Sequence, residues 1–231
     1  MVYEGLEPMT VLAAAAAVTS QVGLVTMVVI GPLRSTAILA KQASTIDRLS
    51  QGRLTLGLSI GARRDDYDAC GVEYRTRGRV LSQQLAELRD RWEMMGSDPD
   101  LLVGGGSDAS LLRMASHADG YVHGGGPPRG FGSAASRVLT AWEDAGRSGR
   151  PQLWAQAYFA LGDEELGNAY LRSYYAFTGA FADKVAAANL TTPTAIKDYL
   201  AGYEEVGCDE LVLLPTVSDL SQLDRLTELL N

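Results

Sequence analysis

The segment from Ile38 to Gly61 constrains the fold most, because it predicts a helix, a tight turn and a buried strand in direct succession. Apolar residues recur near the helical period of about 3.6 residues as far as Leu49, and Gly52 follows where a left-handed helix cap is expected. The next stretch, Leu54–Ile60, is apolar and uncharged, which indicates a strand buried on both faces. Helix-to-strand units of this kind build parallel α/β folds, whose functional groups gather at the carboxyl ends of the strands. We therefore expect functional residues over Ser59–Asp66.

The same alternation of strand and helix patterns runs along the rest of the chain. Further strands are predicted at Val22–Ile30, Leu101–Val103, Gly120–His123, Leu153–Leu161 and Glu210–Leu214. Each gap carries a helical pattern, which means βα units. Six strands with right-handed crossovers can form an open doubly wound sheet or most of an eight-stranded barrel, and the pattern alone does not choose between them.

Composition and charge restrict the class of protein. Residues 1–231 are expected to form a single domain, and a formal net charge of −8 without a basic stripe disfavours nucleic acid as a partner. Only Cys70 and Cys208 occur, and no His, Cys, Asp and Glu residues have metal-ligand spacing, so we expect no disulfide framework and no metal. Met9–Leu33 carries no charge, but an alanine-rich helix over Met9–Thr19 followed by a strand explains it better than a membrane span. We expect a cytoplasmic protein without a membrane partner.

Several short motifs, in chain order, resemble the luciferase-like monooxygenase superfamily. They are Ala13–Thr19, Thr45–Arg53, Gly57, Gly61, Asp66-Tyr67, Gly71-Val72, Gly104–Ser107 and Ala118–Gly120. Members of this family are parallel (βα)8 barrels that bind FMN or the deazaflavin coenzyme F420 and transfer hydride or activate oxygen. The resemblance therefore implies an α/β fold of the parallel (βα)8 TIM-barrel type.

The chain starts late relative to the family pattern. Met1 falls where family members have already completed their first strands and first helix. At about 30 residues per unit, roughly the first one and a half to two βα units are lacking, so we expect a barrel domain that is incomplete at its N-terminus. Strand edges and helix faces that further units would cover then stay open, which predicts a homo-oligomer such as a homodimer.

The glycine run Gly104–Ser107 is the strongest candidate for cofactor binding. It follows a short strand and opens a helix, so backbone N–H groups and the positive end of the helix dipole meet there. With the resemblance, Gly105, Gly106 and Ser107 are expected to hold a cofactor phosphate. A tight turn with Ser107 as the helix N-cap is the alternative interpretation.

The resemblance adds a second part of the cofactor site near the end of the strand Val22–Ile30. It implies a non-prolyl cis peptide within Thr26, Met27 and Val28, in a bulge that supports the flavin ring, with Ser59 nearby. Without the resemblance, Met27 and Val28 are more simply interpreted as barrel core.

His123 is the candidate for a direct role at the site, because it ends a strand on the expected functional rim and its ordinary pKa lies close to neutrality. The acid or base that many family members carry after their second strand would precede Met1, so no other catalytic residue is assigned. Gly124–Gly130 is a candidate lid. Asp47 and Arg53, at the amino end of a strand, are predicted to form a structural ion pair.

These features favour a flavin- or deazaflavin-dependent oxidoreductase or monooxygenase that acts on a small organic substrate. FMN and coenzyme F420 are not distinguishable from the sequence. The alternative is a non-catalytic flavin-binding or structural remnant of the same barrel. An open-sheet nucleotide-binding protein is disfavoured, because Gly57–Gly61 lacks the Gly-x-Gly-x-x-Gly spacing.

Overall fold

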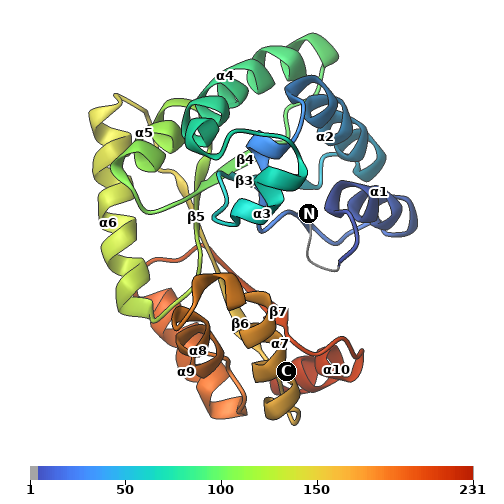
Figure 1. Ribbon diagram of the computed structural model, residues 1–231, viewed down its shortest axis with the longest axis vertical. Coiled ribbons are helices and arrows are strands. Elements are labelled where there is room, and N and C mark those ends of the chain that lie inside the picture. The colour runs from blue at the N-terminus through green and yellow to red at the C-terminus, as the bar shows by residue number, and fades with distance from the viewer. Residues whose placement is uncertain (1–4, 231) are drawn as a thin grey trace. The chain divides into compact units, whose positions relative to one another are not determined.

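The computed structural model describes residues 5–230, which fall into two compact units (Figure 1). Unit 1 comprises residues 5–122 and 137–152, and unit 2 comprises residues 123–136 and 153–230. Among the described residues, no helix is both long and apolar enough to cross a membrane.

Unit 1 alternates helices with parallel strands. Its helices are α1 (Pro8–Val18), α2 (Thr36–Ser50), α3 (Arg64–Ala69), α4 (Arg77–Met95) and α5 (Asp108–His117), with 3₁₀ turns at Gly31–Leu33 and Tyr74–Thr76. Its strands are β1 (Leu24–Val25), β2 (Val29–Ile30), β3 (Leu54–Ser59), β4 (Asp100–Gly104) and β5 (Gly120–His123), the last residue of which belongs to unit 2. Both β1 and β2 pair with β3, β3 pairs with β4, and β4 pairs with β5, all in parallel. The predicted α/β fold with parallel strands is confirmed.

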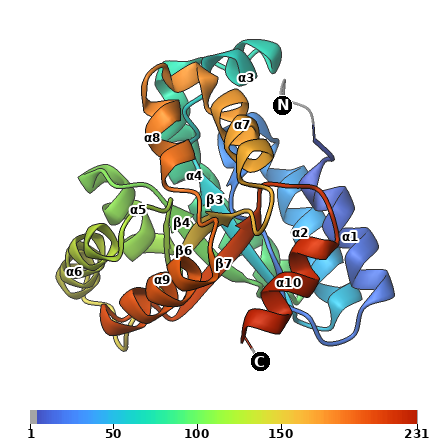
Figure 2. The same ribbon diagram turned by 90° about the horizontal axis from the view of Figure 1, so that it is seen from below.

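Unit 2 follows the same plan. The helix α6 (Pro128–Asp144) begins in this unit and ends in unit 1. The strand β6 (Gln152–Phe159), whose first residue belongs to unit 1, pairs in parallel with β7 (Glu210–Pro215). The other helices are α7 (Glu164–Tyr174), α8 (Phe181–Ala187), α9 (Pro193–Glu205) and α10 (Ser221–Leu230), with a 3₁₀ turn at Ala176–Thr178. α7 and α8 lie side by side (Figure 2).

The amphipathic pattern of α4 shows how the sequence builds the core of unit 1. Leu81, Leu85, Leu88 and Trp92 recur on one face of this helix and are fully buried. The indole N–H of Trp92 donates to the Ala40 carbonyl of α2 at 3.1 Å, so the largest of these side chains also satisfies its polar atom. The buried face of α4 is therefore joined to α2.

The turn between α2 and β3 differs in one detail from the prediction. Gln51 takes the left-handed conformation first, with φ 59°, and Gly52 follows with φ 82°. The Gly52 N–H donates to the Asp47 carbonyl at 2.9 Å and closes the end of the helix. Two successive left-handed residues thus make the turn, where one was expected.

Candidate functional site

The Thr26–Val28 segment is a β-bulge between β1 and β2. Val25 pairs with Thr55, and Val29 pairs with Leu58, so four residue steps on this strand face three on β3. The extra residue is what defines a bulge. The peptide bond between its last two residues is cis. The predicted strand is therefore divided in two, and the bulge with its cis peptide is confirmed.

Gly57 of β3 makes room for this bulge. A Cβ at Gly57 would lie 2.2 Å from the Thr26 carbonyl oxygen and 3.1 Å from Cγ1 of Val28. The buried Thr26 hydroxyl donates to the Gly57 carbonyl and accepts from the Gly57 N–H, both at 2.9 Å. The threonine side chain thus bonds to the strand where the bulge interrupts the regular ladder.

An open pocket of about 490 Å³ borders the bulge. It is lined on one side by Leu6 and by Pro8, Val11 and Leu12 of α1, and on the other by Val25–Val29. Its volume and mainly apolar lining are typical of small-molecule sites. Thr26, Met27 and Val28 therefore share one pocket, and the other predicted cofactor residues do not line it.

Ser59 lies at the carboxyl end of β3, between the bulged strand and the glycine run. Its register partner is Ile30 of β2. On the other side, a Cβ added at Gly104 would lie 3.6 Å from Cβ of Ser59. The structure thus brings Ser59 and the glycine run to one edge of the unit 1 strands, which is where parallel α/β folds bind ligands.

The glycine run enters α5 through a complete helix cap. The Ser107 hydroxyl accepts from the Ser110 N–H at 3.3 Å, and the Ser107 N–H donates to the Ser110 hydroxyl at 2.9 Å. Within residues 5–230, the N–H groups of Gly106, Asp108 and Ala109 have no hydrogen-bond acceptor. The N-cap interpretation is therefore correct for Ser107, and three exposed N–H groups remain open at the helix start.

Arg137 of α6 is a candidate that the sequence analysis missed. Its guanidinium donates to the Gly106 carbonyl at 3.0 Å and forms an ion pair with Asp108 at 2.7 Å. It places a fixed positive charge beside the glycine run. Because Arg137 lies 31 residues from Gly106, no local pattern points to this contact.

His123 belongs to unit 2 and leads into the loop Gly124–Gly126. Its ring contacts Phe131 edge to face, with centroids 5.7 Å apart. Burial lowers the pKa of His123 below its ordinary value, against a smaller opposing effect of a hydrogen bond with the Gly125 backbone. The imidazole is therefore neutral at pH 7 and has both a donor and an acceptor nitrogen.

The loop that was predicted as a lid is anchored within unit 2. The hydroxyls of Tyr199 and Tyr203 in α9 both donate to the Gly126 carbonyl, the second at 2.7 Å. Gln156 of β6 donates to the Gly124 carbonyl at 3.4 Å. Three side chains thus hold the glycine residues that follow His123.

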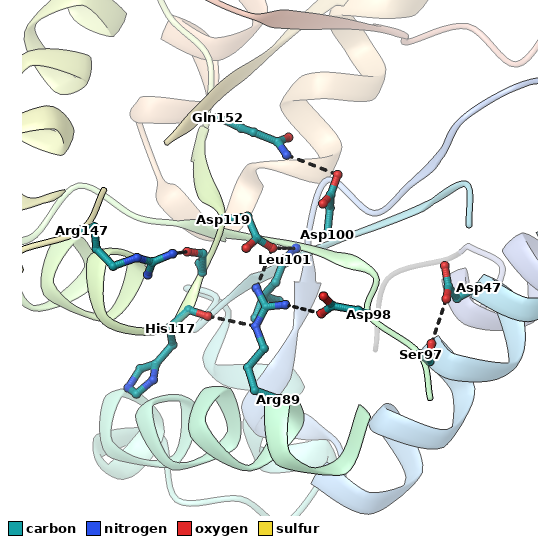
Figure 3. A network of polar contacts seen from close by, with 11 residues as sticks. Asp47, Arg89, Ser97, Asp98, Asp100, Leu101, His117, Asp119, Arg147 and Gln152 are labelled. Carbon is teal, nitrogen blue, oxygen red and sulfur yellow. Dashed lines mark hydrogen bonds and ion pairs between the residues drawn. The ribbon is translucent and has the colours of Figure 1, made fainter. Parts of the chain in front are cut away.

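A polar network joins the amino ends of β4 and β5 in unit 1 (Figure 3). Arg89 of α4 forms ion pairs with Asp98 at 2.8 Å and Asp119 at 2.6 Å. Asp119 also accepts from the Leu101 N–H at 2.8 Å. This end of the strands is opposite the glycine run, so we assign the network a structural role.

The predicted ion pair between Asp47 and Arg53 is wrong. Asp47 accepts from the Ser97 hydroxyl at 2.8 Å (Figure 3). Arg53 instead donates to backbone carbonyls, among them that of Thr19 at 2.8 Å and that of Ser50 at 2.7 Å. The guanidinium donates its hydrogen bonds to carbonyl groups at the ends of α1 and α2 in place of a carboxylate.

The chain belongs to the luciferase-like monooxygenase family, whose family description matches residues 1–207. It is 31% identical over 163 residues to an uncharacterized protein of Mycobacterium tuberculosis, covering 62% of this chain and 56% of that protein. It is also 31% identical over 174 residues to the pyrimidine monooxygenase RutA of Pseudomonas syringae, covering 62% of this chain and 47% of that protein. The chain therefore spans about half the length of the curated relatives it matches.

Solved structures share the fold. An F420-dependent secondary alcohol dehydrogenase, in complex with an F420-acetone adduct, has a TM-score of 0.81 at 13% identity over 94% of this chain and 81% of that one. The riboflavin lyase RcaE, solved with a modified FMN and riboflavin, has a TM-score of 0.75 at 18% identity over 99% of this chain and 73% of that one. At such identities the likeness establishes the fold alone.

Proposed function

We propose that this chain is part of a flavin- or deazaflavin-dependent oxidoreductase or monooxygenase that acts on a small organic substrate. The open N–H groups at the start of α5 carry the proposal, and the family supports it. One structural neighbour is F420-dependent and another was solved with a modified FMN, so either cofactor is proposed. One relative is named a pyrimidine monooxygenase, which supports including monooxygenase activity in the proposal. The proposed protein has a parallel (βα)8 fold and a cytoplasmic location, the latter in keeping with two free cysteines.

The glycine run fits a cofactor phosphate. The N–H groups of Gly106, Asp108 and Ala109 have no acceptor in the described part of the chain and lie at the positive end of a helix, which favours an anion. Arg137 adds positive charge at this position. The Asp108 carboxylate opposes it, but its side chain is 98% exposed and already paired with the arginine. We propose Gly105, Gly106 and Ser107 as the phosphate site.

We propose that the remaining predicted residues contact the cofactor ring or transfer a proton. Thr26, Met27 and Val28 border a pocket and, with Ser59, are proposed to contact the ring. The bound flavin or deazaflavin supplies hydride transfer, or oxygen activation in the case of FMN. The neutral imidazole of His123 is the proposed group that takes up or releases a proton.

The test compares two variants, Gly106→Val and Gly130→Val, in which the new side chain has space around it. A Cβ at Gly106 or at Gly130 meets no atom within 4 Å, and neither residue has a positive φ. Gly106→Val blocks approach to the open N–H groups, and Gly130→Val is the matched control. Gly105 is less suitable, because its φ is +131° and a Cβ there would lie 2.8 Å from the Ser110 hydroxyl, so that Gly105→Val would also disturb the helix cap.

The purified protein is titrated with FMN, with F420 and with the phosphate-free ring fragment of whichever binds, riboflavin in the case of FMN. Hydrogen bonds to a charged group contribute about 1.5–3 kcal/mol each, so Gly106→Val is expected to weaken the cofactor roughly ten- to a hundredfold. It should leave the phosphate-free fragment unaffected, and Gly130→Val should change neither affinity. Equal affinities for wild type and Gly106→Val would refute the phosphate site, and no binding of either cofactor would refute the proposed function.

A further inference from the structure

Gln156 and Tyr158 lie on the same face of β6 in unit 2. Side chains alternate along a strand, so Ala157 and Phe159 point to the opposite face, where they join the buried cluster with Ile196. Gln156 is only 8% exposed. Its Nε2 donates at 3.4 Å to the Gly124 carbonyl and at 3.5 Å to the Tyr158 hydroxyl, which are long bonds. Its Oε1 accepts no hydrogen bond from the described residues, so a buried amide is only partly satisfied.

The Tyr158 hydroxyl also lies 2.7 Å from the Tyr175 hydroxyl. Burial raises the pKa of both tyrosines, so both keep their protons at neutral pH. Since Gln156 donates to the Tyr158 oxygen, the Tyr158 proton is free to go to Tyr175. The hydrogen bonds are then donated from Gln156 to Tyr158 and from Tyr158 to Tyr175. The proton of Tyr175 is left without an acceptor among the described residues and is a donor for a ligand.

The segment containing α7 and α8 brings Tyr175 to Tyr158. It leaves β6 after Phe159 and returns at Leu190, whose backbone forms a parallel bridge with Phe159. The Leu190 N–H donates to the Tyr158 carbonyl at 2.9 Å, and the Ala160 N–H donates to the Leu190 carbonyl at 3.0 Å. These bonds fix both ends of the segment at the carboxyl end of β6. The hydroxyl pair is therefore held in place before a ligand arrives.

We propose that Gln156 and Tyr175 bind a small cyclic amide or imide, whose N–H donates to Gln156 Oε1 and whose carbonyl accepts from the Tyr175 hydroxyl. The acceptor, Gln156 Oε1, and the donor, the Tyr175 hydroxyl, lie on either side of the Tyr158 hydroxyl. A cyclic amide or imide matches this pair, because its ring carries an N–H donor beside a carbonyl acceptor. Neither group is charged at neutral pH, which favours a neutral ligand over a carboxylate. The binding of this ligand is inferred independently of the proposed function, and only its role as the substrate rests on that function.

The test measures binding without turnover. Uracil is the probe, because it carries N–H groups beside carbonyls, and N,N-dimethyluracil is the control ligand without N–H donors. Calorimetry is carried out on wild type, Tyr175→Phe and Gln156→Leu, with and without added cofactor. Tyr170→Phe removes a hydroxyl from α7, the helix for which Tyr175 is the C-cap residue, and leaves the Tyr158–Tyr175 pair in place. Circular dichroism checks that each variant is folded.

Wild type is expected to bind uracil at least tenfold more tightly than N,N-dimethyluracil. Tyr175→Phe and Gln156→Leu should each lose about tenfold in affinity for uracil, and Tyr170→Phe should stay within about twofold of wild type, a tenfold change being about 1.4 kcal/mol. No uracil binding by wild type, or equal binding by folded Tyr175→Phe, overturns the inference. Cofactor titrations of the same samples separate this result from the proposed function, because Tyr175→Phe should bind cofactor as wild type does.

Discussion

Replacing Gly57 by alanine tests how the bulge is built. The added Cβ would lie 2.2 Å from the Thr26 carbonyl oxygen, a backbone atom that cannot turn aside as a side chain does. Overpacking of this kind costs about 1–3 kcal/mol. Moving Thr26 also breaks two hydrogen bonds of its hydroxyl with Gly57, each contributing about 1 kcal/mol. We therefore expect Gly57→Ala to lower the free energy of unfolding by about 3–5 kcal/mol, a large part of the stability of an ordinary domain.

Urea unfolding followed by tryptophan fluorescence measures the change, because the buried Trp92 and Trp142 lie in the same unit as Gly57 and only Trp154 lies in unit 2. Gly106→Ala is the control, since a Cβ there meets nothing within 4 Å and the expected change is under about 1 kcal/mol. Thr26→Ser keeps the hydroxyl and should be less harmful than Thr26→Val, which leaves the Gly57 N–H and carbonyl without their partner. If Gly57→Ala were as stable as Gly106→Ala, the bulge would not depend on a missing side chain, and the reasoning would fail.

Two further predictions concern stability and assembly in unit 1. Burial opposes ionisation of Glu7, but hydrogen bonds from Thr10, Met9 and Arg34 lower the pKa of its carboxyl group from 4.5 to about 2. The ionised Glu7 therefore stabilises the folded state above pH 4.5, and this stabilisation is lost as the pH falls towards 2. Because Glu7 is partly exposed, Glu7→Gln should cost about 1 kcal/mol of unfolding free energy at pH 7 and almost nothing at pH 2; an equal cost at both would contradict this. The chain should self-associate through the edge formed by β1 and β2, beside the exposed Val11 and Val22, as measured by sedimentation at micromolar concentration. Val22→Lys should weaken this association and Leu112→Lys on α5 should not, whereas a monomeric wild type would exclude it.

The sequence predicted those parts of the fold that depend on local periodicity. The stripe of Leu81, Leu85, Leu88 and Trp92 predicted a helix packed on a sheet, and all four side chains are buried. The same reasoning was less successful for α2, where Ile38 and Leu49 fit the apolar pattern but are 59% and 50% exposed. A repeat of about 3.6 residues determines which side chains share a face, but the packing of other elements determines how much of that face is covered.

The sequence by itself determined the order of helices and strands and the capped glycine turn at Gly104–Ser107, because hydrophobic spacing and cap residues act over a few neighbouring positions. Only the tertiary structure decided that Arg137 reaches Gly106, that Asp47 bonds to Ser97 and that Tyr175 meets Tyr158. Each of these contacts joins different elements of the fold. Their geometry depends on the register and packing of those elements, which no local spacing in the chain records.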